Sequence, residues 1–258
     1  MTNKWLKVAL MVTAIATGTS IKIDAETVLY VPQDDRPVSL QYTVDTAREA
    51  GMTVLTPPQH LISGKTYQGQ ADQIMAWVEQ NAGRADVMVL STDTLIFGGL
   101  VDSRKHNIPL STLQNRLKRI EGLKARNKNV RIYGFGTVMR SPRASGGGTE
   151  PAYYAEYGPT IFQIAALQDK LDSGSLTQEE TQKLMSLQAS VPVEYLQDWF
   201  DRRQKNMKIN KELIDETRSG VFDYFALGHD DTSQLSQSAL EGRYLNKYSK
   251  DISVEKYG

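Results

Sequence analysis

The sequence predicts an α/β protein built from parallel β/α units, arranged either as an open doubly wound sheet or as part of a (β/α) barrel. Short apolar runs rich in valine, isoleucine, leucine and aromatic residues recur along the chain and do not alternate with polar residues, which is typical of strands buried on both faces. Amphipathic helical stretches separate the runs. Right-handed crossovers between them would bring the C-terminal ends of the strands to one edge of the sheet.

Five strands are predicted, each from one of these apolar runs. They lie at residues 27–31, 52–55, 86–91, 130–136 and 221–228. Their enrichment in β-branched and aromatic residues, rather than their periodicity, distinguishes them from short buried helices.

Helices are predicted between the strands from apolar residues at helical spacing. The first covers 40–50 and ends before Gly51, and the second covers 70–81. The third begins at Ser111, where "STLQ" fits a capping box.

A long insertion separates the fourth and fifth strands. It opens with a loop at 141–158 that contains three consecutive glycines, followed by a mostly helical segment at about 159–218 with a second capping box, "TQEE", at Thr177. After the fifth strand, one more helix is predicted at roughly 234–248.

Composition bounds the function classes. The chain has 258 residues, 40% hydrophobic and 23% charged, which suits one large globular domain. Lys+Arg and Asp+Glu number 30 each, so no global field favours nucleic acid or an anionic membrane. The absence of cysteine from the sequence excludes thiol catalysis and cysteine metal sites.

The N-terminus predicts export. Residues 1–25 join a basic "MTNKWLK" to a short apolar "VALMVTAIATG", as a secretory signal peptide cut after Ala25 would. The apolar run is too short to span a bilayer comfortably, so no stable membrane span is expected after cleavage. The α/β domain would then be 26–258, and the protein secreted, periplasmic or in the cell envelope. The alternative is an N-terminal strand or helix of the core.

Charged residues follow four of the five predicted strands. They are Asp34, Asp35 and Arg36 after the first strand, Asp93 after the third, Arg140 after the fourth, and His229, Asp230 and Asp231 after the fifth. Because sites in open α/β sheets and in barrels form at the C-terminal ends of strands, these side chains predict one polar site.

Backbone geometry limits which of these side chains can meet. Adjacent residues of an extended chain point to opposite sides, so one of Asp34 and Asp35, and one of Asp230 and Asp231, should face the site. Pro37 restricts Arg36 to an extended conformation, which suits bidentate binding of a carboxylate. The alternative is an internal Asp–Arg network that only ties loops together.

Four further side chains are candidates for substrate binding. Glu150, Tyr153 and Tyr154 follow the glycine run and would form either a lid with stacking faces for sugar rings or an anchor for the loop. Arg104, after Gly98 and Gly99, could face the site or solvent.

The motifs together give a resemblance to a known family. The chain is similar to an uncharacterised bacterial family, domain of unknown function 4127, over most of residues 28–232. The matching motifs are "YVPQDDRPVS", "STDTLIFGGLVDSR", "TVMRSPR", "EPAYYAEYG" and "DYFALGHDDTS". The resemblance implies that this chain is an N-terminal portion whose partner would be the missing C-terminal half. It implies no particular reaction.

The strand-end acids favour a carbohydrate-active hydrolase of the glycosidase kind, acting on a glycan or small molecule without a cofactor. Its working carboxyls would be Asp93 and one of Asp230 and Asp231. Asp34 or Asp35, with Arg36, would orient the substrate.

Two alternatives stay open. Clustered aspartates with His229 are suitable ligands for Mg²⁺ or Mn²⁺ in a hydrolase of phosphate esters or amides. A non-catalytic exported solute-binding protein, or an inactive fragment, is the other alternative. The sequence has no GxGxxG motif after the first strand, no Walker A loop, no GxSxG elbow and no HExxH, which excludes the dinucleotide, NTP, serine-hydrolase and zincin classes.

Overall fold

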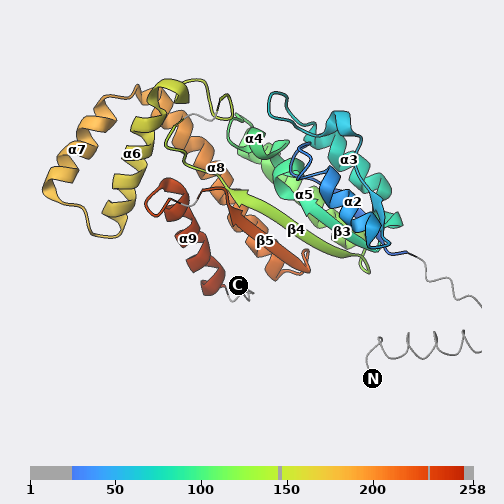
Figure 1. Ribbon diagram of the computed structural model, residues 1–258. Coiled ribbons are helices and arrows are strands. Elements are labelled where there is room, and N and C mark those ends of the chain that lie inside the picture. Colours follow the sequence, from blue (N-terminus) through green and yellow to red (C-terminus); the bar gives the residue numbers. More distant parts are fainter. Residues whose placement is uncertain (1–24, 145–146, 232, 253–258) are drawn as a thin grey trace, which may run out of the picture.

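A computed structural model describes residues 25–144, 147–231 and 233–252. Its centre is a five-stranded, all-parallel sheet (Figure 1). The strands are β1 (Thr27–Val31), β2 (Thr53–Leu55), β3 (Val87–Ser91), β4 (Arg131–Val138) and β5 (Tyr224–His229). The predicted α/β class is therefore confirmed.

The strand order is β2-β1-β3-β4-β5, which leaves β2 and β5 at the two edges. Doubly wound sheets such as that of flavodoxin use this order. Among the described residues no pairing joins β2 to β5, so the sheet is open and the barrel alternative is not confirmed.

Most of the predicted helices lie within a few residues of their expected positions. The helices are α2 (Gln41–Glu49), α3 (Ala71–Asn81), α4 (Leu100–Ser103), α5 (Leu110–Arg126), α6 (Tyr154–Asp172), α7 (Gln178–Ala189), α8 (Val193–Arg218) and α9 (Gln237–Asp251). Short turns of 3-10 helix occupy Gln59–Leu61 and Ala82–Arg84, and a π-helix occupies Asp93–Phe97.

The two capping-box predictions have opposite outcomes. Thr177 accepts a hydrogen bond from the backbone of Glu180, whose side chain returns one to Thr177, as predicted. The box at Ser111 is wrong, because α5 begins one residue earlier at Leu110 and no side chain caps it. Pro109 precedes the helix in an extended conformation, and its ring fixes the φ angle at which the chain enters the helix.

One face of the sheet carries the main core. Leu29 and Val31 of β1 and Met88 and Leu90 of β3 point to this face, where they are fully buried. They pack there in one cluster with apolar residues of α3, α5 and α8. A further cluster joins α9 to α8 and to Val138 of β4 on the same side.

The other face is covered only in part. Val44 of α2 packs there against Tyr30 of β1 and Val54 of β2. Farther along, Tyr133 of β4 is partly exposed and Tyr224 of β5 is 45% exposed. Among the described residues, α2 is the helix that the hydrophobic clusters place on this face.

The insertion between β4 and β5 forms its own small core. Helices α6 and α7 extend from the sheet beside the N-terminal half of α8 (Figure 1). Tyr154 of α6 and Trp199 of α8 are fully buried between them, with ring centroids 4.9 Å apart. The prediction of a mostly helical insertion is confirmed, although its first helix begins at Tyr154 rather than at 159.

Parallel pairing brings the C-terminal ends of β1, β3, β4 and β5 to one edge of the sheet. This edge is where the predicted site would form.

The predicted signal peptide, residues 1–25, lies outside the described ranges except for Ala25. Residues 253–258, at the end of the chain, also lie outside them. No helix in the described part of the chain has both the length and the apolar character needed to cross a bilayer.

Candidate functional site

Asp93 is a buried acid of the site. It is 2% exposed and begins the π-helix that follows β3, a rare element often found at functional sites. Gln33 Nε2 and Thr137 Oγ1 donate to its Oδ2 at 2.8 and 2.9 Å, which leaves Oδ1 unused by these two donors. Burial raises the pKa of Asp93 to about 6, although hydrogen bonds from the Gln33 side chain and from the side chain and backbone of Thr137, and the charge of Arg104, oppose the shift.

The raised pKa of Asp93 predicts that this residue contributes more to the free energy of unfolding at acid pH than at neutral pH. A carboxyl whose pKa is higher in the folded state than in the unfolded state contributes stability that is fully present below the unfolded value, near 3.8. The contribution is lost as pH rises through about 6. From pH 7 to pH 5 we expect wild type to gain about 1 kcal/mol relative to Asp93→Asn, measured by urea unfolding. Equal changes in the two proteins would contradict the assignment.

Arg104 occupies the centre of the site. The chain leaves the π-helix through Gly98, whose φ of +110° favours glycine, and then forms the short helix α4. The Arg104 side chain is only 5% exposed and pairs with Asp230, which follows β5. Its Nη1 lies 3.9 Å from Oε1 of Glu150. Burial lowers the pKa of Arg104, and the charge of Asp230 opposes that shift.

Glu150 connects Arg104 to the end of β4. Its carboxyl is buried and accepts a hydrogen bond from Arg140 Nε at 2.8 Å. Thr149 Oγ1 donates to the second carboxyl oxygen at 2.9 Å and accepts from Arg140 Nη2 at 2.8 Å. Glu150 thus lies between two guanidinium groups, which offset the cost of burying its charge.

At the end of β1, two adjacent acids take different directions. Asp34 is buried and pairs with Arg36 Nη2 at 2.7 Å and with Arg36 Nε at 2.8 Å. Asp35 instead accepts a hydrogen bond from the Tyr67 hydroxyl. Hydrogen bonding to Asp34 raises the pKa of Arg36, burial opposes the shift, and the charges of Asp34, Asp230 and Asp35 make smaller contributions that also raise it.

These residues form one group, which we call the acid–arginine cluster. Its members are Asp34, Arg36, Asp93, Arg104, Arg140, Glu150 and Asp230. Three arginines face three acids plus Asp93, so the cluster is neutral when Asp93 is protonated and carries one negative charge when it is ionised. The members that reach solvent are Arg36, Asp230 and Arg140, with side chains 53%, 26% and 24% exposed.

Besides Asp35, four of the predicted site residues lie outside the acid–arginine cluster. Asp231 accepts hydrogen bonds from the backbone of Ser141 and Ser233 at 3.0 and 2.7 Å, and so ties two loops together. His229 is exposed, and its ring packs so closely on Gly242 of α9 that a methyl group there would overlap it.

The two tyrosines anchor the insertion. The Tyr153 hydroxyl donates to Asp198 at 2.6 Å, and its ring stacks on Tyr195. Tyr154 is fully buried and donates to the carbonyl of Pro142, so its ring presents no face to a ligand. Of the two alternatives that the sequence left open, the structure shows the loop anchor for this residue.

Two residues of the site were missed by the sequence analysis, namely Gln33 and Thr137. Both follow or end a predicted strand, so their positions gave the same signal as the aspartates. Neutral polar side chains are common at strand ends, so Gln33 and Thr137 do not stand out in the sequence. Their role depends on the buried Asp93 carboxyl to which both donate.

In the described ranges, no three histidine, aspartate or glutamate side chains group so that they could hold a metal ion. The acids at the strand ends pair with arginines instead, and His229 lies against α9. The predicted Mg²⁺ or Mn²⁺ ligand set is therefore not brought together by these residues.

The fold and the cluster define an α/β protein with a polar site at the C-terminal edge of its sheet. The site lies next to β1 and β3, where the strand order reverses. A family model matches residues 28–257, and the chain belongs to that family, described as protein of unknown function (DUF4127). The resemblance found in the motifs is thereby confirmed.

Other comparisons add little. No curated protein matches the chain. Among solved structures, the crystal structure of Rv3272 from M. tuberculosis, in its orthorhombic form, is similar at 12% identity and a TM-score of 0.22. The match covers 89% of this chain and 51% of that one, so this chain spans about half the length of the solved protein. At this TM-score the similarity carries no argument.

Proposed function

We propose that the protein is an exported hydrolase of the glycosidase kind, in which Asp93 is the proton donor and Asp230 the second carboxyl. The observation that carries the proposal is the pKa of Asp93, raised to about 6 by burial at a strand end. A carboxyl with such a pKa is mostly protonated below about pH 6, where it can release its proton to a leaving oxygen.

The environment of Asp230 differs in the way that two-carboxyl catalysis requires. Asp230 is ion-paired with Arg104 and partly exposed, whereas Asp93 is buried and bonded to neutral donors. Asp230 thus has a cationic partner, whereas burial favours the neutral form of Asp93. Arg36 at the rim would bind substrate hydroxyl groups, which would enter between it and Arg104 toward Oδ1 of Asp93.

The test is hydrolysis of a panel of nitrophenyl glycosides and neutral polysaccharides by the full chain. We expect release of reducing sugar from at least one substrate and its loss in Asp93→Asn. No cleavage across the panel would contradict the proposal. Saturable binding of a sugar without any turnover would favour the exported solute-binding protein instead. Export is supported by the pattern of residues 1–25, and the mature chain recovered outside the cytoplasm should begin at Glu26.

A further inference from the structure

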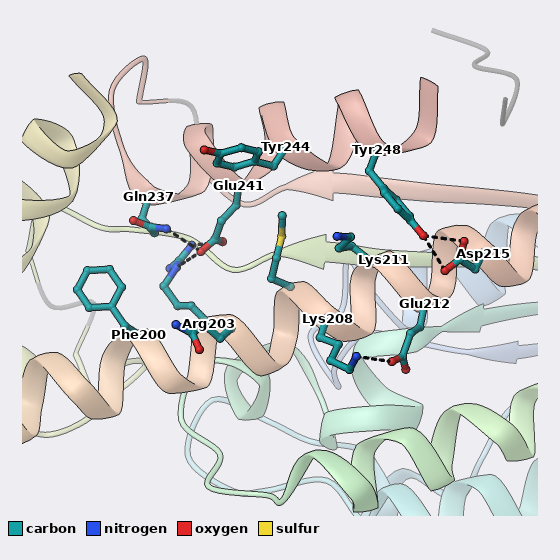
Figure 2. A pocket seen from close by; sticks show the side chains of 12 residues that line it. Phe200, Arg203, Lys208, Lys211, Glu212, Asp215, Gln237, Glu241, Tyr244 and Tyr248 are labelled. Atoms are coloured by element: carbon teal, nitrogen blue, oxygen red, sulfur yellow. Dashed lines mark hydrogen bonds and ion pairs between the residues drawn. The ribbon is translucent and has the colours of Figure 1, made fainter. Parts of the chain in front are cut away.

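A groove of about 610 Å³ runs between α8 and α9, apart from the acid–arginine cluster (Figure 2). Its volume lies within the roughly 300–1,000 Å³ typical of small-molecule sites. Arg203, Met207 and Lys211 line it from α8, and Gln237 and Tyr244 line it from α9. The proposed function assigns no role to these residues.

The charges that line the groove are matched. Arg203 Nη2 pairs with Glu241 Oε2 at 2.7 Å, and Lys208 lies 3.6 Å from Glu212. Lys211 Nζ lies 4.5 Å from the centre of the Tyr248 ring, a cation–π contact. Asp215 also lines the groove, so three acids balance three cations and no excess charge attracts an anionic ligand.

One buried acceptor in the groove lacks a donor. Gln237 Nε2 donates to Glu241 Oε1 at 3.1 Å, and Arg203 Nε donates to the same oxygen at 2.7 Å. Gln237 Oε1 is buried and has no hydrogen-bond partner among the described residues. A buried acceptor without a partner costs free energy, so a ligand hydroxyl or N–H group that donated to it would bind favourably.

The groove also offers flat apolar surface. Tyr244 is 49% exposed, and its hydroxyl donates to Asp172 of α6, which fixes the direction of the ring. Phe200 adds apolar surface on the α8 side (Figure 2), and Met207 of the same helix also lines the groove. An uncharged ligand with hydroxyl donors and a flat C–H face matches this lining, and sugar rings have both properties.

The groove is joined to the end of β4. Arg203 Nη1 donates to the carbonyl of Arg140 at 2.9 Å, and Nη2 donates to that of Met139 at 2.6 Å. Arg140 belongs to the acid–arginine cluster through Glu150. Through Arg203 the groove therefore contacts the backbone of one member of the cluster.

We propose that the groove between α8 and α9 binds a neutral oligosaccharide, with one ring on Tyr244 and one hydroxyl donating to Gln237 Oε1. The choice of a sugar rests on the proposed function, whereas the neutral character and the donor requirement rest on the lining itself. The groove would hold part of a glycan whose cleavage takes place at the cluster.

The test is isothermal titration calorimetry with maltohexaose, cellohexaose and chitohexaose, and with hexagalacturonate as the anionic comparison. We expect at least one neutral oligosaccharide to bind more tightly than hexagalacturonate. Tyr244→Ala should weaken that binding about tenfold, since the stacking contribution of one ring approaches 1.4 kcal/mol. Tyr244→Phe keeps the ring and should bind within about twofold of wild type.

Tyr224→Ala is the matched control, because Tyr224 is similarly exposed, at 45%, but belongs to β5 and points to the partly covered face of the sheet. It should bind as wild type does. Binding of no neutral oligosaccharide, tighter binding of hexagalacturonate, or unchanged affinity in a folded Tyr244→Ala would overturn the proposal. Binding without hydrolysis would leave the groove assignment standing and refute only the proposed function.

Discussion

Replacing Arg203 with alanine is expected to lower the free energy of unfolding by about 3–5 kcal/mol, the usual cost of removing one partner from a buried ion pair. The Arg203 side chain is 1% exposed and forms a bidentate pair with Glu241, drawn in Figure 2. It also donates to two backbone carbonyls of the chain leaving β4 and lies over the Trp199 ring at 5.2 Å. Alanine would leave a carboxylate and two carbonyls without these donors.

Urea unfolding followed by far-UV circular dichroism measures this change. Lys208→Ala is the matched control on the same helix, because its pair with Glu212 is solvent-exposed and should contribute less than about 1 kcal/mol. Arg203→Lys should recover only part of the loss, since one ammonium group cannot replace a bidentate fork and two carbonyl contacts. A loss below about 1 kcal/mol in Arg203→Ala would show that the network does not hold α8, α9 and β4 together.

The second large effect concerns catalysis by Asp93. If the proposed function holds, Asp93→Asn should lower kcat by a factor on the order of 10² to 10⁴, the range for losing a general acid. Wild-type kcat should fall as pH rises above about 6, because Asp93 must carry its proton to act as an acid. The residual activity of Asp93→Asn should lack this dependence on pH.

Asp86→Asn is the control for this experiment. Asp86 directly precedes the same strand, β3, at the edge of the sheet opposite Asp93, where it accepts a hydrogen bond from the backbone of Thr27. It should keep wild-type kcat and the same pH profile. An Asp93→Asn protein with full activity, or a wild-type profile that does not change near pH 6, would remove Asp93 from the mechanism.

Much of the architecture could be predicted from the sequence. The apolar runs located all five strands because strands of a parallel sheet are drawn from β-branched, apolar and aromatic residues, a composition that few other elements share. The order β2-β1-β3-β4-β5 could not be predicted, since the runs are too alike to indicate which neighbour each strand takes.

Part of the candidate site could be predicted from the parallel arrangement of the strands. Parallel topology alone brings Asp34, Asp93 and Asp230 to one edge. The position of Arg104 depends instead on the path of the chain through the π-helix and Gly98, which no local pattern indicates. The role of Tyr154 could not be predicted, because a tyrosine that follows a glycine-rich loop has the same sequence pattern whether it covers a ligand or packs in a core. Its contact with the Trp199 ring shows that it packs in the core of the insertion.

The partly covered face of the sheet has a thermodynamic consequence. Tyr133 and Tyr224 already meet water in the folded chain, so unfolding exposes less new apolar area there than it would beneath a helix. Apolar hydration dominates the heat capacity increment of unfolding, which is therefore smaller than a fully covered sheet of this size would give. Its curve of stability against temperature is correspondingly broad, and cooling weakens the fold less steeply.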